Sequence, residues 1–296
     1  MTDPDFIIPF DQLPNRFAEN IEDPPETPAI PRPAATIVLL RDAEHGMEVL
    51  LMRRSRKAGF VPGAYVFPGG RVDGTDAGPK TIEQLDGLTP ESAASRLELE
   101  NGEPPAIAYY LAALREAFEE TGILVGLRSD GSTPPTAAED SSVDSVRDDL
   151  MENRISFAEA IALLQCRIAG DAIEYLAHWI TPTPEPRRYD TRFFAAKVRS
   201  GAEAIIDPRE MTDALWLTPA EALRRCDEGD LPMIFPTIKT LEQLVPHETV
   251  DEALEAVGRR PVQTLMPTLI ITPTGVGMQL RSETDDGDAS PAGTEQ

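Results

Sequence analysis

REAFEETGI, residues 115–123, ends a predicted helix with three glutamates and a glycine. Helical periodicity begins near Ala106 and continues to Thr121, and Gly122 stands where a left-handed C-cap is usual. After Gly122 the apolar run ILVGL is typical of a strand. The interpretation of the remaining chain starts from this helix and its acidic end.

The predicted helix has an apolar stripe and an acidic side. At 100° per residue, one narrow stripe collects four large apolar side chains, Ile107, Leu111, Leu114 and Phe118. This stripe is the side expected to face the core. The opposite side carries Glu116, Glu119 and Glu120, and above them on the wheel lie Tyr109, Ala112 and Ala113. The two alanines leave room in front of the acidic side.

The three glutamates conflict with local helix physics. Glu116 forms like-charge pairs with Glu119 and Glu120, each costing about 0.2–0.5 kcal/mol on an isolated helix. The acids also crowd the end where the helix dipole is already negative. A solvated acidic face is the common explanation of such a run, but conflicts of this kind favour a functional site. A divalent cation would remove both conflicts, and three converging carboxylates suit Mg²⁺ or Mn²⁺.

The segment GGRVDGTDAG, residues 69–78, supplies a second piece of the pattern. REAFEETGI resembles the second half of a Nudix box, in which a glycine, five residues and a glutamate precede an Arg-Glu-apolar-x-Glu-Glu-x-Gly-apolar run. Here Gly70 is followed by five residues and then Asp76, an acid in place of glutamate. Between Asp76 and Arg115 lie 38 residues where the family has seven. We interpret the gap as an insert in an intact box.

The resemblance extends to later segments. HWITP (178–182) and RRYDTRFF (187–194) are similar to the branch of the Nudix family with an interrupted box, which includes a peroxisomal acyl-coenzyme A diphosphatase of mammals. DALWLTPAEAL (213–223) is similar to the strand and helix that end many Nudix domains. The resemblance covers about residues 34–225. The peroxisomal location is not carried over, because the chain shows no peroxisomal ending.

Membership of this family would imply metal-dependent hydrolysis of a diphosphate. The resemblance makes Glu116, Glu119, Glu120 and the carbonyl of Gly70 the ligands of one to three Mg²⁺ or Mn²⁺ ions. It gives Arg115 the task of orienting a ligand glutamate by a salt bridge, so Arg115, Glu119 and Glu120 are expected catalytic residues. Asp76 is shorter than glutamate and is not expected to be a direct ligand. Glu210, from a later loop, is the candidate general base.

The substrate is expected to be a nucleotide-containing cofactor. Five arginines are candidate contacts for its phosphates: Arg53, Arg54, Arg187, Arg188 and Arg192. Coenzyme A or acyl-CoA is the first expectation, from the branch resemblance alone. NADH, ADP-ribose and sugar nucleotides remain alternatives within the enzymes. A nucleotide-binding sensor that does not cleave its ligand is the alternative from another class, although such domains usually lose the box carboxylates that this chain keeps.

Composition excludes several classes of protein. The formal net charge of −24 over 296 residues argues against a nucleic-acid-coating surface. No apolar run is long enough to span a membrane, and the N-terminus lacks the features of a signal peptide. The two cysteines and three histidines are scattered, which argues against a site built from them. We expect a cytoplasmic enzyme that acts on a small molecule and can form a homodimer.

The expected fold class is α/β: a Nudix α/β/α sandwich with a mixed sheet, helical insertions and C-terminal helices. The runs AATIVLL (34–40) and MEVLLMRRS (47–55) flank a turn and predict a β-hairpin. The expected divisions are an irregular arm (1–33), the Nudix domain (34–225) with inserts at about 77–105 and 128–172, a helical extension packed on it (226–280), and a disordered tail (281–296).

Overall fold

Two neighbouring strands form the centre of the main sheet. In the computed structural model, which describes residues 4, 6–10, 17–56 and 61–280, they are β2 (Arg32–Ala43) and β3 (Gly46–Arg54). They pair antiparallel as the predicted hairpin. Residues 37–40 and 49–52 are completely buried. Consecutive side chains of a strand point to opposite faces, so both faces of this sheet are covered.

The chain divides into two compact units, which are described separately. The larger unit holds residues 32–179 and 190–263, and the smaller unit holds residues 1–31, 180–189 and 264–296. In the larger unit the sheet order is β11-β3-β2-β10-β9, with β4 beside β3 and β5 beside β2. The further strands of this sheet are β4 (Tyr65–Val66), β5 (Gly69–Arg71), β9 (Ile173–Ile180), β10 (Tyr189–Lys197) and β11 (Met211–Leu217).

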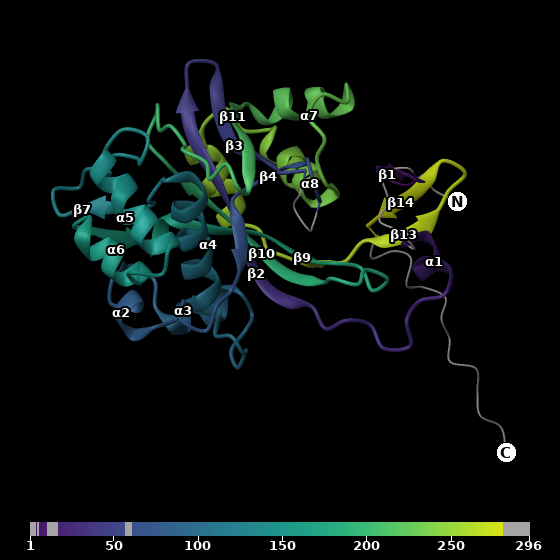
Figure 1. The fold of residues 1–296 in the computed structure, drawn as a ribbon, viewed down its shortest axis with the longest axis horizontal. Coiled ribbons are helices and arrows are strands. Elements are labelled where there is room, and N and C mark those ends of the chain that lie inside the picture. Colours follow the sequence, from purple (N-terminus) through teal and green to yellow (C-terminus); the bar gives the residue numbers. More distant parts are fainter. Residues whose placement is uncertain (1–3, 5, 11–16, 57–60, 281–296) are drawn as a thin grey trace. The chain divides into compact units, whose positions relative to one another are not determined.

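Helix α4 (Ala106–Thr121) covers one face of the sheet, with the bounds predicted from the sequence. Its apolar stripe packs with alternate residues of β2 and β3, such as Leu39 and Leu50. The other face of the sheet is covered by helices that follow β11 (Figure 1). These are α7 (Pro219–Asp227), α8 (Phe235–Leu244) and α9 (Val250–Gly258). The arrangement is the expected α/β/α sandwich.

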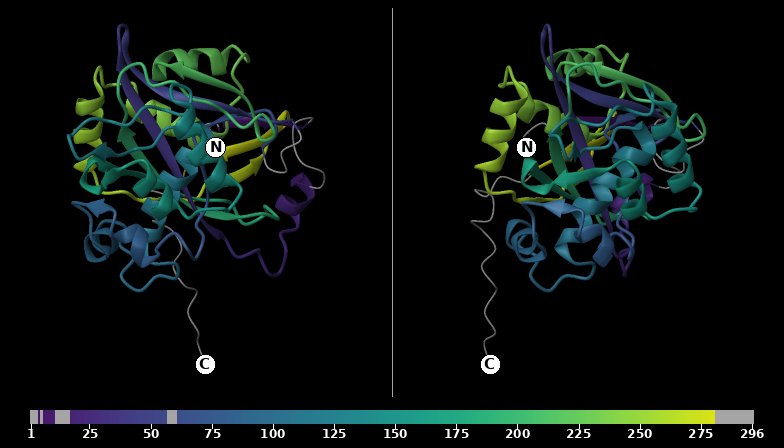
Figure 2. Two further views of the ribbon diagram at one scale, coloured as in Figure 1. Left: turned by 60° about the vertical axis from the view of Figure 1, so that its left-hand side comes forward. Right: turned by 90° about the vertical axis from the view of Figure 1, so that its left-hand side faces the viewer.

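The two segments expected to be inserts pair with each other. The first contains α2 (Pro79–Ile82), β6 (Leu85–Asp86) and α3 (Pro90–Arg96). The second contains β7 (Leu127–Arg128), α5 (Ser141–Met151), α6 (Phe157–Leu163), β8 (Cys166–Ala169) and a 3₁₀ turn at Gly170–Ala172. β6 pairs with β8 in parallel and β7 pairs with β8 antiparallel. Their helices gather beside α4, away from α7 and α8 (Figures 1 and 2).

The smaller unit corrects the expectation of an irregular N-terminal arm. Residues 6–9 form β1 (Phe6–Pro9), which pairs antiparallel with β14 (Gly275–Gln279). β13 (Thr268–Ile271) pairs with the other edge of β14. The unit also contains α1 (Phe17–Glu22) and β12 (Thr264–Leu265). The segment 226–280 therefore ends in strands and is not helical throughout, and the tail 281–296 lies outside the described residues.

No helix in the described part of the chain is long and apolar enough to cross a membrane.

Gly122 ends α4 in the left-handed conformation, with φ of 69°, and its N–H donates to the carbonyl of Phe118. A Cβ at this position would lie 2.5 Å from Cβ of Ala137 and 2.8 Å from Cγ2 of Ile205. We expect Gly122→Ala to lower the free energy of unfolding by more than the ~1–2 kcal/mol of a left-handed residue alone. Urea denaturation measures this.

Gly131→Ala is the matched control for this substitution. Gly131 also has a positive φ, of 80°, but nothing lies within 4 Å of its Cβ position. The amount by which Gly122→Ala lowers the free energy of unfolding more than Gly131→Ala does measures the clash at the end of α4. Equal losses at the two positions would contradict the close packing described there.

Candidate active site

A pair of glycines lies directly against the acidic end of α4. Gly69 and Gly70 belong to β5, whose register places Gly70 opposite Ala35 of β2. A Cβ at Gly70 would lie 2.4 Å from the carboxyl carbon of Glu116. Any side chain at this position would therefore displace that carboxylate. The glycine brings the backbone of β5 into direct reach of the helix.

Glu120 is bound to the same strand. Its Oε2 accepts a hydrogen bond of 2.9 Å from the backbone N–H of Gly69. The pKa of Glu120 is raised to about 8, chiefly by burial and also by the charges of Glu116 and Glu210, against the lowering effects of the Gly69 hydrogen bond and Arg54. A carboxyl group in this position is short of nearby positive charge.

Arg115 forms the centre of the site. Its Nε and Nη2 donate to the two carboxylate oxygens of Asp76, at 2.7 and 3.3 Å. Its Nη1 donates to Glu116 at 2.9 Å and to Glu119 at 3.1 Å. Nη2 also donates to the carbonyl of Arg71. One guanidinium thus joins the two halves of the split motif and orients two glutamates.

Asp76 anchors the guanidinium from the other side. It is 4% exposed and accepts a further hydrogen bond, of 2.7 Å, from the backbone N–H of Asp73. The spacing from Gly70 singled out this residue, but the sequence did not tell which partner its short side chain reaches. The structure pairs it with Arg115 at hydrogen-bond distance.

Burial weakens the acidity of all three glutamates. It raises the pKa of Glu116 to about 7, against the opposing effect of Arg115, and it also raises the pKa of Glu119. Burial by itself lowers the pKa of Arg115, but the hydrogen bond to Asp76 and the charges of Glu116 and Glu119 more than offset this. The cluster holds more negative groups than one guanidinium can balance.

The expected convergence of three carboxylates on one point is not seen in this arrangement. Among the residues that the structure describes, no group of three or more His, Cys, Asp or Glu side chains is set to hold a metal ion. The reason is that Arg115 holds Glu116 and Glu119, while Glu120 turns to the N–H of Gly69. A metal ion would have to compete with these contacts.

The charges of Arg54 and Glu210 act on Glu120, since Arg54 lowers its pKa and Glu210 raises it. Met211, at the start of β11, is paired with Arg54, and the carbonyl of Glu210 accepts a hydrogen bond of 2.8 Å from Ser55. The Glu210 side chain is exposed. Nε of Arg54 is buried and has no hydrogen-bond partner among the described residues. A buried guanidinium N–H of this kind can still donate a hydrogen bond to an anionic group.

The other predicted arginines have different surroundings. Arg192 is 5% exposed, donates to Asp190 at 3.2 Å and covers the ring of Tyr109. In the smaller unit, Arg188 donates to the carbonyls of Thr181 and Ala29, and Arg187 is exposed. Arg53 donates to the carbonyl of Gly63 at 3.3 Å. Internal contacts occupy Arg188 and part of Arg192, whose buried Nε, like that of Arg54, has no hydrogen-bond partner among the described residues. Their role as phosphate contacts stays a prediction.

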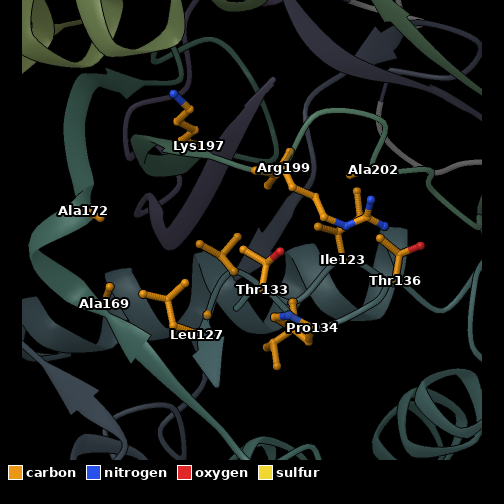
Figure 3. Close-up of a pocket in the computed structure, with 14 residues that line it drawn as sticks. Ile123, Leu127, Thr133, Pro134, Thr136, Ala169, Ala172, Lys197, Arg199 and Ala202 are labelled. Carbon is orange, nitrogen blue, oxygen red and sulfur yellow. The ribbon is translucent and has the colours of Figure 1, made fainter. Parts of the chain in front are cut away.

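A small cavity lies at the end of α4 (Figure 3). It has a volume of about 110 Å³ and is lined mainly by apolar groups, from Ile123 to Leu127, and by Pro134 and Ala202. None of the site carboxylates lines it. The cavity is therefore separate from the candidate active site.

The raised pKa of Glu120 predicts how metal-free stability depends on pH. Between its ordinary pKa of 4.5 and about 8, the folded protein retains a proton that the unfolded chain releases. The free energy of unfolding should therefore fall as pH rises through this window, and the loss should be complete above pH 8. Glu120→Gln should remove this part of the pH dependence.

Urea denaturation in EDTA at pH 5 and pH 8.5 tests this expectation. The variant should gain stability relative to the wild type between the two pH values. Parallel pH dependence of wild type and variant would contradict the assignment of a buried, protonated Glu120.

Comparison with known proteins places this geometry in a family. A model of the NUDT19 Nudix domain matches residues 26–244, well over half of the chain. Acyl-coenzyme A diphosphatase NUDT19 of Xenopus laevis is 26% identical over 244 residues, which cover 73% of this chain but only 64% of that relative. The human protein of the same name is 25% identical over 266 residues, covering 78% of this chain and 70% of the relative.

The fold has a solved counterpart. A Nudix hydrolase from Alicyclobacillus acidocaldarius superposes with a TM-score of 0.63 and 26% identity, covering 79% of this chain and 99% of that structure. The segment that the family model matches, residues 26–244, includes the strands of the main sheet, α4 and both halves of the split motif. The chain therefore belongs to the NUDT19 Nudix domain family.

Proposed function

We propose that this protein is a metal-dependent diphosphatase that cleaves the diphosphate of coenzyme A or an acyl-CoA. The observation that carries the proposal is the acidic end of α4, held against Gly69 and Gly70 by the Arg115–Asp76 pair. The printed names of the Xenopus and human relatives support the choice of substrate.

The donor set fits a hard divalent cation. Glu116, Glu119, Glu120 and the carbonyl of Gly70 offer only oxygen atoms, which Mg²⁺ and Mn²⁺ prefer. The raised pKa values of Glu116 and Glu120 support the same conclusion, because a cation would favour their ionised forms. Such an ion supplies charge neutralisation of the diphosphate and activation of a water molecule.

The remaining residues have separable tasks. Arg115, fixed by Asp76, orients Glu116 and Glu119. Arg54 has a buried Nε without a partner among the described residues, and a diphosphate oxygen would satisfy it. Glu210, exposed directly before β11 and with a charge that acts on Glu120, is the candidate base that accepts the proton of the attacking water.

The proposed substrate is a small anion and not a nucleic acid. The net charge of −24 repels an extended phosphate backbone, whereas a metal ion and one arginine can reverse the field locally. A cytoplasmic location and a homodimer remain predictions. Cell fractionation and sedimentation of the purified chain measure them.

A substrate screen tests the proposal directly. CoA, acyl-CoA, NADH, ADP-ribose and dinucleoside polyphosphates are incubated with Mg²⁺ or Mn²⁺ in ¹⁸O-labelled water, and products are identified by mass. Hydrolysis of the diphosphate of CoA should give two phosphate monoesters, one of which carries the label. If NADH or ADP-ribose is cleaved in preference to CoA and acyl-CoA, it replaces CoA as the proposed substrate. If none of these compounds is cleaved, a nucleotide sensor is favoured.

Two substitutions at the end of α4 should abolish most turnover. Glu119→Gln and Glu120→Gln keep the size of the side chain but remove its charge, and each should lower kcat about 100-fold or more. Glu83→Gln, on an exposed residue of the first insert, is the control and should be unchanged. Near wild-type Mg²⁺-dependent turnover in either site variant would show that the site is wrongly assigned.

Gly70→Ala should weaken metal binding. The added Cβ would overlap the carboxylate of Glu116, so Mn²⁺ affinity should fall about 10–100-fold, the usual effect of disturbing the surroundings of a metal ligand. Gly74→Ala is the matched control, because nothing lies within 4 Å of its Cβ position. Titration calorimetry with Mn²⁺ compares the two, and equal affinities would argue against Gly70 as part of the metal site.

A further inference from the structure

Arg147 is a buried arginine of the second insert, and its side chain reaches α4. It lies in α5, is 4% exposed, and its Nε donates a hydrogen bond of 2.8 Å to the backbone carbonyl of Glu119. That carbonyl is one of the last four of α4, which have no partner within the helix. Nη1 lies 3.5 Å from Asp144 of the same helix, and Nη2 has no partner among the described residues.

The end of α4 is tied to two flanking segments. The carbonyl of Gly122 accepts from the N–H of Ala137 at 2.9 Å, and the carbonyl of Thr121 accepts from the N–H of Ile205 at 2.9 Å. Ala137 belongs to the same insert as Arg147. The insert therefore holds the helix end at two points, while the segment that begins at Ile205 holds it from another side.

The segment that delivers Glu210 is joined to the same helix end. The N–H of Ile205 binds the carbonyl of Thr121, two residues after the Glu119 carbonyl that Arg147 binds. The carbonyl of Asp207 accepts the N–H groups of Glu210 and Met211, at 3.1 and 2.9 Å. Asp207 thus opens the turn that leads Glu210 into β11.

We propose that Arg147 is a positioning residue that fixes the end of α4 and, through the hydrogen bond of Thr121 with Ile205, the segment that leads into the 207–210 turn. Through these two segments it sets Glu119, Glu120 and Glu210 around one ligand. It does not touch the reacting atoms itself. The assignment rests on the proposed function, because that function gives these three glutamates a common ligand.

Arg147→Met tests this role because methionine fills much of the same space but cannot donate a hydrogen bond. Mn²⁺ affinity and kcat should each fall about 10–100-fold, the usual cost of removing a partner that orients metal ligands. KM should stay within about twofold, since Arg147 makes no substrate contact. Arg147→Lys keeps the charge and one donor, and it should recover part of the loss.

Leu150→Ala is the matched control for loss of stability. Leu150 is a buried residue of the same helix, 5% exposed, and its truncation should lower the melting temperature without altering kcat or Mn²⁺ affinity. If Arg147→Met folds and keeps both values within twofold, or if Leu150→Ala lowers them equally, the proposal is overturned. If Arg147→Met is insoluble, Arg147→Lys undergoes the same measurements with a smaller expected loss.

Hydrogen exchange separates failure of this inference from failure of the proposed function. In Arg147→Met, peptides covering 115–126 and 203–213 should both exchange faster than in the wild type, whether or not any substrate is cleaved. Faster exchange confined to α5 would overturn the positioning role. If Arg147→Met shows faster exchange in both peptides but the wild-type protein binds no Mn²⁺ and cleaves no diphosphate, the proposed function alone is overturned.

Discussion

The site depends on one guanidinium that is shared between two distant parts of the chain. Arg115 uses three nitrogens to bind Asp76, Glu116 and Glu119, and all of these bonds lie within 3.3 Å. Without it, the acids would repel one another at the negative end of a helix. Arg115 also donates to the carbonyl of Arg71, and Glu120 accepts from the N–H of Gly69, so β5 and the helix are joined at two points. The repulsion within the acidic cluster is therefore offset in part by Arg115, while burial, the main cause, keeps the pKa values of Glu116 and Glu120 raised.

The long gap in the motif does not disturb this surface. The 38 residues between Asp76 and Arg115 leave and return at points joined by an ion pair of 2.7 Å. Loop-closure entropy rises only slowly with length, so an insert of this size is tolerated. The insert is also stabilised by the second insert, through the pairing of β6 with β8. The two inserts thus support each other as well as the helix beside them.

The parts of the fold that follow local rules could be predicted from the sequence. α4 has the predicted bounds because its apolar period and Gly122 are both local signals. The hairpin of β2 and β3 follows from signals of the same kind. The pairing partners of arginines are not local. Arg188 binds carbonyls 159 and 7 residues away, and Arg147 reaches a carbonyl 28 residues away. No spacing rule indicates such contacts, so neither role could be predicted.

The pairing of Asp76 with Arg115 affects which of the two inserts can vary in length and composition during evolution. The first insert begins directly after Asp76 and ends at the start of α4, so both partners of the Asp76–Arg115 ion pair lie outside it. Its length and composition are therefore uncoupled from the chemistry of the carboxylates. New segments can be accepted there while the site stays intact. The second insert has no such freedom, because Arg147 and Ala137 tie it to the helix end. The first insertion point can therefore tolerate new sequence during evolution, whereas the second insert is constrained by its contacts with the end of α4.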